Sequence, residues 1–216
     1  MMKIAKTLSK TFAVSFTSAL LMTAPTYAKT LTIGIDLSGS NPLLSDPAFA
    51  VNAARFAEDQ VSALQNGDVL QLMRFGARTS TENLQTQRIV ISGRNRPKKM
   101  AKQVEAYIRA LPKQLNKGQP STNLVTWLEF TNGFNCNEQS TVLAITDGLE
   151  SSSVISAKAF ITGSKSLPTP DVDLTGCKVI FYGLGAGLEF TAIKHIRKGW
   201  TDYLGKSGAE FSYIAP

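Results

Sequence analysis

Residues Leu31 to Ser40 read LTIGIDLSGS, a short apolar run that ends in the pattern Asp36-x-Ser38-x-Ser40. Such a run is typical of a strand buried in a sheet. The pattern then places one carboxylate and two hydroxyls at alternate positions where the strand ends. These oxygen side chains suit a hard cation such as Mg²⁺. Alone the pattern is weak evidence, because it arises by chance in roughly a few per cent of chains of this length.

The first residues have the features of a secretory signal peptide. Three lysines and no acidic residue occupy the first ten positions, residues 12–24 are apolar apart from Ser and Thr, and small residues precede a cleavage point after Ala28. A retained membrane anchor is the weaker alternative, because the apolar stretch is shorter than the ~20 residues that span a bilayer. We therefore predict a signal peptide at 1–28 and one exported domain at 29–216. The periplasm is the expected destination, with secretion beyond it as the alternative.

The size and charge of the chain limit the classes of protein to which it can belong. The exported chain would have 188 residues, enough for one domain with a full core. Removing the signal lysines lowers its formal charge from +7 to +4. One basic stretch contains Arg94, Arg96, Lys98, Lys99 and Lys102. It has no interleaved aromatic residues and no nucleic-acid motif, so we interpret it as a solvated loop and helix start, with contact to an anionic surface as the alternative, and expect no nucleic-acid partner. No later segment is apolar enough to cross a membrane.

Strand-like and helix-like patterns alternate along the chain. The expected strands are 31–36, 69–75, 88–91, 141–146, 178–183 and 210–214. The expected helices are 47–64, a segment from 97 to 111, 123–130, a partial helix at 157–161, and 189–204. The nearly unbroken apolar runs TVLAIT and KVIFYG fit parallel strands that are buried on both faces. The alternation predicts one α/β domain with a mostly parallel sheet between helices.

Oxygen side chains follow two of these strands. In such sheets, ligands bind beyond the carboxyl ends of the strands where the strand order reverses. Asp36, Ser38 and Ser40 follow the first strand, and Asp147 follows TVLAIT. Thr122 opens a helix after a Gly/Pro loop, where its hydroxyl could cap the helix or bind a metal.

With these positions the chain resembles the von Willebrand factor type A domain family. That family's metal-ion-dependent adhesion site has D-x-S-x-S after the first strand, a Thr in a middle loop, and an Asp, often followed by Gly, after the fourth strand. The matching residues are Asp36, Ser38, Ser40, Thr122 and Asp147. The resemblance covers most of the exported chain. It implies a Rossmann-like, doubly wound six-stranded sheet of order 3-2-1-4-5-6, with an antiparallel third strand and helices on both faces.

The resemblance also implies a role for each ligand. Asp36 and Asp147 would converge on one ion, expected to be Mg²⁺ with Mn²⁺ or Ca²⁺ as alternatives. Ser38 and Ser40 look like direct ligands, whereas Thr122 and the two aspartates would bind directly or through water. The position left open on the metal would take a carboxylate from a protein partner. The alternative interpretation is a set of caps and turn formers that no longer binds metal.

The two cysteines, Cys136 and Cys177, form an even pair. In an exported protein such a pair suggests a disulfide, and two buried thiols are the alternative. The strand order that the resemblance implies places both at the amino ends of neighbouring strands, opposite the metal site. This placement favours the bond.

Three functional hypotheses follow. The first is an exported, non-catalytic module that binds an acidic group of a protein partner through the metal. The second is a structural component of an envelope complex, such as secretion, pilus or conjugation machinery. The third, a metal-assisted hydrolase using Asp36 and Asp147, is disfavoured because no general base or activated nucleophile accompanies them. The connection from Glu150 to Gly176 is our candidate for partner specificity, with an unimportant surface excursion as the alternative.

Three other signals are given less weight. His195 is the only histidine and has no nucleophile placed beside it. The glycines of residues 183–187 are interpreted as a turn between a strand and a helix. Trp127 and Trp200 are expected in the core or at an interface. The sequence leaves the oligomeric state open.

Overall fold

The structure, a computed structural model, describes residues 28–77, 83, 86–115, 117–130 and 136–215. The predicted signal peptide lies outside the described residues except for Ala28. Within the described part of the chain, no helix combines the length and apolar character needed to cross a bilayer.

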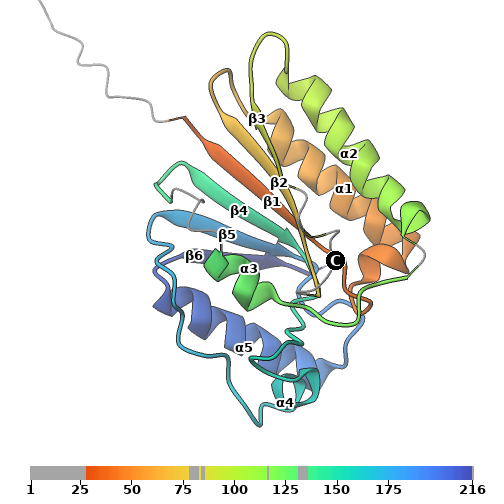
Figure 1. Cartoon of the computed structure of the whole chain (residues 1–216), viewed down its shortest axis with the longest axis vertical. Helices are drawn as coiled ribbons and strands as arrows, with labels where there is room; N and C mark the ends of the chain where they lie inside the picture. Colours follow the sequence, from red (N-terminus) through yellow and green to blue (C-terminus); the bar gives the residue numbers. More distant parts are fainter. Residues whose placement is uncertain (1–27, 78–82, 84–85, 116, 131–135, 216) are drawn as a thin grey trace, which may run out of the picture.

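A six-stranded sheet forms the centre of the domain (Figure 1). Its strands are β1 (Thr30–Asp36), β2 (Val69–Phe75), β3 (Thr86–Val90), β4 (Ser140–Ile145), β5 (Cys177–Tyr182) and β6 (Glu210–Ile214). The strand order is β3-β2-β1-β4-β5-β6, and only the pairing of β3 with β2 is antiparallel. The predicted sheet order and the antiparallel third strand are therefore confirmed.

Helices pack on both faces of this sheet, as Figure 1 shows. The helices are a 3-10 turn η1 (Pro42–Leu44), α1 (Pro47–Ser62), α2 (Pro97–Gln114), α3 (Leu124–Phe130), α4 (Ala157–Ile161) and α5 (Phe190–Lys206). The helices α1 and α2 contribute to one apolar cluster, whereas α3, α4 and α5 contribute to the other. Two apolar layers thus sandwich the sheet, so its central strands β1 and β4 are buried on both sides.

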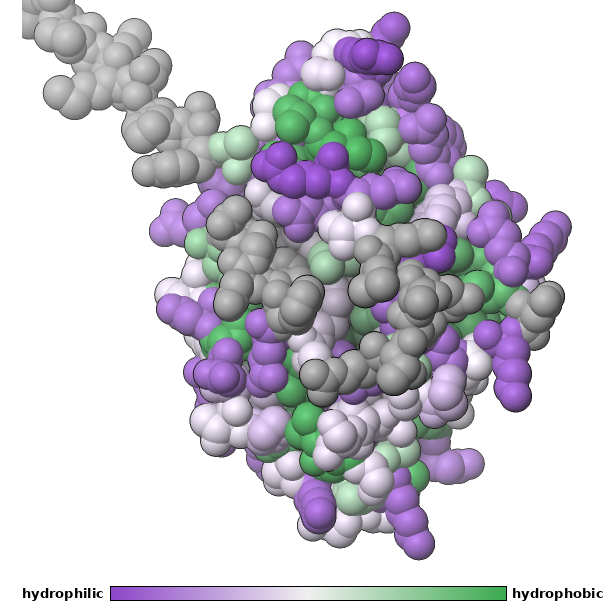
Figure 2. Space-filling view, in the orientation of Figure 1, coloured by the Kyte–Doolittle hydropathy of each residue, from purple (hydrophilic) through white to green (hydrophobic). Residues whose placement is uncertain are grey.

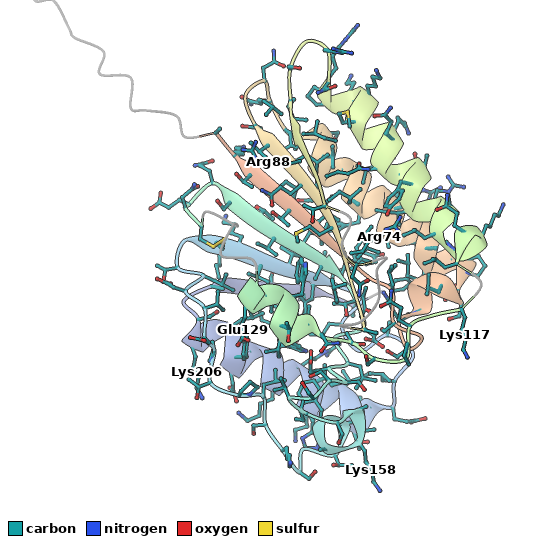
Figure 3. The ribbon with its side chains drawn as sticks, viewed as in Figure 1. Arg74, Arg88, Lys117, Glu129, Lys158 and Lys206 are labelled. Carbon is teal, nitrogen blue, oxygen red and sulfur yellow. A yellow bond between two sulfur atoms is a disulfide. The ribbon has the colours of Figure 1, made fainter. Side chains whose placement is uncertain are left out.

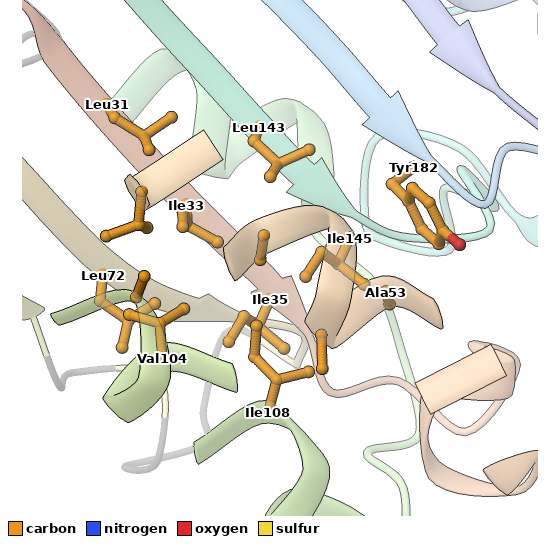
Figure 4. Packing of buried hydrophobic residues seen from close by; sticks show 14 of the residues in the cluster. Leu31, Ile33, Ile35, Ala53, Leu72, Val104, Ile108, Leu143, Ile145 and Tyr182 are labelled. Carbon is orange, nitrogen blue, oxygen red and sulfur yellow. The ribbon is translucent and has the colours of Figure 1, made fainter. Parts of the chain in front are cut away.

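Alternation along β1 explains how both layers form. Ile33 and Ile35 have no exposed surface and pack in the cluster of α1 and α2, which Figure 4 shows from close by. Gly34 faces the other layer, where a Cβ atom would lie 2.3 Å from the ring of Trp127. That ring stacks on Phe75 with centroids 4.8 Å apart. Glycine at this position therefore lets α3 lie against the strand.

The predicted disulfide is present between Cys136 and Cys177, whose Cα atoms are 4.8 Å apart. It is drawn as the yellow bond in Figure 3. Cys177 begins β5 and pairs in register with Ser140, the first residue of β4. The bond thus ties the amino ends of two central strands, at the edge opposite the predicted metal site.

Candidate metal centre

The two predicted aspartates lie at the same edge of the sheet. β1 and β4 are parallel neighbours, with Ile35 opposite Ile145 in register. Asp36 ends β1, and Asp147 follows β4 by two residues. Neither residue has any exposed surface. The register of the sheet therefore brings the two carboxylates to one buried place.

Asp36 is held in a single orientation by two hydrogen bonds. The Ser38 N–H donates to Oδ1 at 2.8 Å, and the Thr146 hydroxyl donates to Oδ2 at 2.7 Å. The same hydroxyl accepts the Gly148 N–H at 2.9 Å. Thr146 therefore links the loop after β1 to the loop after β4. Thr146 was not among the predicted residues, and its place directly before Asp147 is the one signal that the sequence offers for it.

Asp147 has one oxygen without a partner. The Leu149 N–H donates to Oδ1 at 2.9 Å, but Oδ2 is buried and accepts no hydrogen bond from the described residues. A buried carboxylate oxygen left this way is costly unless a proton or a cation compensates it. This oxygen marks the place where a cation would fit.

The raised pKa values of the two aspartates also favour a bound cation. Burial raises the pKa of Asp36 to about 7, and repulsion from Asp147 adds to the increase, whereas hydrogen bonds from Thr146 and Ser38 oppose it. Burial likewise raises the pKa of Asp147 to about 6, although the bond from Leu149 and the nearby Ser40 hydroxyl lower it. Two negative charges away from water repel each other, and a divalent cation between them would relieve that cost.

The other three predicted residues lie in loops at the same edge of the sheet. The Oγ atoms of Ser38 and Ser40 lie 3.2 Å apart and share a hydrogen bond. Thr122 is almost fully buried, and its backbone exchanges two hydrogen bonds of 3.0 Å with Ser151. This pairing fastens the Thr122 loop to the segment that follows Asp147. All five predicted residues therefore lie in three loops at one edge of the sheet.

Gln119 connects these loops to one another. The Gly39 N–H donates to the Gln119 carbonyl at 2.9 Å, and the Gln119 N–H donates to the Leu37 carbonyl at 2.8 Å. Its side-chain Oε1 accepts the Ala77 N–H at 2.7 Å, and its amide also exchanges hydrogen bonds with Asn83 at 3.1 Å. Gln119 was not among the predicted residues, because a glutamine in a polar loop carries no signal of such a role.

Two further buried polar residues support the edge. The Asn41 side chain donates to the carbonyls of Asp36 at 2.8 Å and Ile145 at 3.2 Å, so it bridges the ends of β1 and β4. Glu150 Oε2 accepts the N–H groups of Leu124 at 2.8 Å and Val125 at 3.0 Å, at the start of α3. Burial raises the pKa of Glu150 to about 7. Asn41 directly follows the opening motif, which was the only hint of its role.

The donor set selects a class of metal. Among the residues that the structure describes, no group of three or more His, Cys, Asp or Glu side chains gathers to hold a metal. Two carboxylates and several hydroxyls are hard oxygen donors, which suit Mg²⁺, Mn²⁺ or Ca²⁺ rather than a metal that prefers nitrogen or sulfur. The residues present thus fit the predicted cation.

The long connection from Glu150 to Gly176 adjoins this edge only at its beginning. Ser151 pairs with Thr122, but later residues pack along α5, where the Leu174 N–H donates to the Ser207 carbonyl at 2.7 Å. The exposed His195 is also on α5, beside a cavity lined in part by residues of the connection. Only the first residues of this connection are therefore expected to contribute to specificity at the metal edge.

No protein-family model matches the sequence, and no curated protein matches it. Solved structures with a similar chain path include the pilus adhesin SpaC from Lactobacillus rhamnosus GG in its open conformation (12% identity, TM-score 0.47). Others are the manganese-loaded Plasmodium vivax TRAP protein (14%, 0.45) and an aerotolerance-related membrane protein from Bacteroides fragilis (13%, 0.42).

These alignments cover 89%, 87% and 88% of this chain, respectively. They cover 28% of the adhesin, 68% of the TRAP chain and 92% of the aerotolerance-related protein. This chain therefore spans less than a third of the adhesin. At such identities and TM-scores the similarities carry no argument about activity. The strand order itself establishes a Rossmann-like, doubly wound α/β fold with an antiparallel third strand.

Proposed function

We propose that this protein is an exported, non-catalytic protein-binding module. It holds a divalent cation at Asp36, Ser38, Ser40, Thr122 and Asp147 and uses it to engage an acidic group of a protein partner. The observation that carries the proposal is the buried Oδ2 atom of Asp147, which accepts no hydrogen bond from the described residues and lies at the same sheet edge as a second buried carboxylate.

The charge balance supports an anionic ligand. Asp36 and Asp147 would neutralise a divalent cation without giving the site a net negative charge. A hard divalent cation takes six or more oxygen ligands, so it can accept a further carboxylate beside the protein donors. Ser40 and Gly39 are exposed, whereas Asp36, Ser38 and Asp147 are buried. The remaining position on the metal would thus face solvent on the Ser40 side, where a partner can reach it.

The surroundings of the site favour binding over catalysis. The Ser38 hydroxyl contacts the Ser40 hydroxyl, and neither is paired with an imidazole. His195 lies on α5, beside the separate cavity that contains Lys165 and Lys198. A hydrolase would need a base or a nucleophile next to the metal. The described residues at this place supply only the buried carboxylates of Asp36 and Asp147 and the neighbouring hydroxyls.

Calorimetric titration with Mg²⁺ and Mn²⁺ tests the metal site. Chelator-stripped protein should bind one equivalent of metal, and the Asp147→Asn variant should lose that binding. Asp59→Asn, which changes an exposed aspartate on α1, is the matched control and should bind as the unmodified protein does.

Partner capture from an envelope extract tests the use of that metal. Capture should require the metal, disappear with a chelator and disappear in Asp147→Asn. If the variant binds no metal but retains its partners, the metal-dependent module is wrong and the envelope-assembly role replaces it. Turnover of an ester or phosphate substrate that disappears in the same variant would instead indicate a hydrolase.

A further inference from the structure

The end of the molecule opposite the metal centre carries an unpaired basic surface. We define it as the basic loop, formed by Arg94, Arg96, Lys98 and Lys99. All four side chains are exposed, and none forms an ion pair with a described residue. The neighbouring Lys102 differs, because it pairs with glutamates at 2.8 and 3.3 Å. The basic loop therefore keeps four uncompensated charges.

The surroundings of the basic loop strengthen its positive potential. Its side chains border a shallow hollow that is completed by Ser62, Asn66, Gly93 and Pro97, without any acidic residue. The helix α2 begins at Pro97 and has no acidic residue in its first turn, and the capping residue Arg96 makes no side-chain cap. The amino-terminal end of a helix carries partial positive charge, which adds to that of the side chains.

The chain enters the fold at the same edge. The Val69 N–H donates to the Lys29 carbonyl at 2.8 Å, and the Gly67 N–H donates to the Ile91 carbonyl at 2.9 Å. These bonds place the start of β1 beside the turn before β2, and that turn beside the segment that leads into the basic loop. Figure 1 shows the same neighbourhood, and Figure 2 shows hydrophilic side chains at the end where β3 leads into α2. In the sequence, the apolar stretch 12–24 precedes this point.

We propose that this edge docks on an anionic lipid surface, so that the metal centre points away from the membrane. The apolar stretch would deliver the chain to a membrane by the very edge that carries the basic loop. Lysine and arginine side chains near an anionic bilayer each add to its attraction for a protein. The proposal does not depend on metal binding.

The form of the basic loop favours a lipid surface over other anions. Its four cations are all exposed, so they suit headgroups spread over a plane rather than one enclosed phosphate. The hollow has no aromatic side chain on which a nucleic-acid base could stack. A broad, mobile array of negative charges is the partner that this surface fits best.

Vesicle co-sedimentation tests the proposal with the exported protein as it is purified from cells. The protein should sediment with phosphatidylglycerol-containing vesicles, fail to sediment with pure phosphatidylcholine, and lose binding as salt is raised. Replacing all four residues of the basic loop by Gln should reduce partition at least about tenfold. The double variant Lys98→Gln/Lys99→Gln gives a smaller loss in the same direction, should the fourfold variant fail to fold.

The control removes the same charge elsewhere. Its four substitutions, each to Gln, are at the exposed residues Lys158, Lys165, Lys194 and Lys206. This control should keep vesicle binding. An equal loss in both would show that overall charge rather than this edge drives binding. Unchanged binding of the basic-loop variant, or displacement from vesicles by inorganic phosphate or a short DNA duplex at lower concentration than the lipid, would also overturn the proposal.

Discussion

The substitution Asp147→Asn should make the metal-free protein at least as stable as the unmodified protein, yet less stable when Mg²⁺ is present. Asparagine retains the oxygen that accepts the Leu149 N–H. It removes the negative charge from a place where Asp36 is also buried. Without metal, that loss of charge is favourable, whereas with metal it removes a ligand. The relative stability of the two proteins should therefore reverse with the metal.

The magnitude follows from the pKa of Asp147, which is raised from 3.8 to about 6. A group whose pKa is higher in the folded than in the unfolded protein contributes fully to folding stability below its unfolded-state pKa. That contribution is lost as the pH rises through the folded-state pKa. At pH 8 the unmodified protein therefore bears the whole cost of keeping an ionised Asp147 buried, which is ~3 kcal/mol for a pKa raised by about two. An amide N–H that gains no acceptor there costs about 1–3 kcal/mol, and one that gains an acceptor costs less. The variant should therefore be about 0–2 kcal/mol more stable without metal.

Metal binding reverses this difference. At about 100 times its dissociation constant, a cation bound only to the folded state stabilises by ~2.7 kcal/mol. For a domain of this size, that corresponds to a rise in Tm of about 5–10 °C. The unmodified protein should show this rise, and Asp147→Asn should show none.

Thermal and urea unfolding at pH 8, with chelator and with MgCl₂, measure both effects. The Asp59→Asn control should respond to Mg²⁺ as the unmodified protein does. If Asp147→Asn is less stable than the unmodified protein in chelator and neither protein responds to metal, then Asp147 acts as a turn former and the site does not bind metal.

Other perturbations test separate parts of the structure. Because burial raises the pKa of Glu150 from 4.5 to about 7, the protein should lose up to ~3 kcal/mol of stability between pH 4.5 and 8, and urea unfolding should show a flatter profile for Glu150→Gln. An unchanged slope would contradict the burial of that charge. Cys136→Ser should cost about 2–4 kcal/mol in urea unfolding, with calorimetric metal binding unchanged because the disulfide lies at the opposite edge; a large change in affinity would refute that separation. Gly34→Ala should destabilise by about 1–3 kcal/mol because its Cβ would meet the Trp127 ring, whereas Gly205→Ala, with open space around it, should be neutral or stabilising in the same assay.

The sequence patterns predicted the limits of every strand to within two residues. The limits of β2, α4 and β6 agree with the expected ranges. The third strand was expected at 88–91 but is Thr86–Val90. Its residues are mostly exposed at the edge of the sheet, so no apolar run marks its limits. Ile91 is buried yet lies outside the strand, because its backbone bonds to the turn before β2. Burial alone did not distinguish strand from turn there.

The candidate ligands and their supports differed in how far they could be predicted. Ligands are specified by residue type at strand ends, so spacing and a family resemblance identified all five candidates. Thr146, Gln119 and Glu150 act through hydrogen bonds to groups far away in the sequence. No periodicity records such a bond. Their roles became visible only once the register of β1 against β4 fixed which loops meet.

The supports have a consequence for how a cation would bind. The Asp36 orientation is fixed by Ser38 and Thr146, and the loops are joined through Gln119 and Asn41, all by hydrogen bonds within the protein. Binding would therefore not have to order these loops, which saves conformational entropy. Affinity would then depend mainly on dehydration of the ion and on relief of the repulsion between the two carboxylates. Removing a support such as Gln119 should weaken metal binding without removing any ligand, whereas removing Asp147 should abolish it.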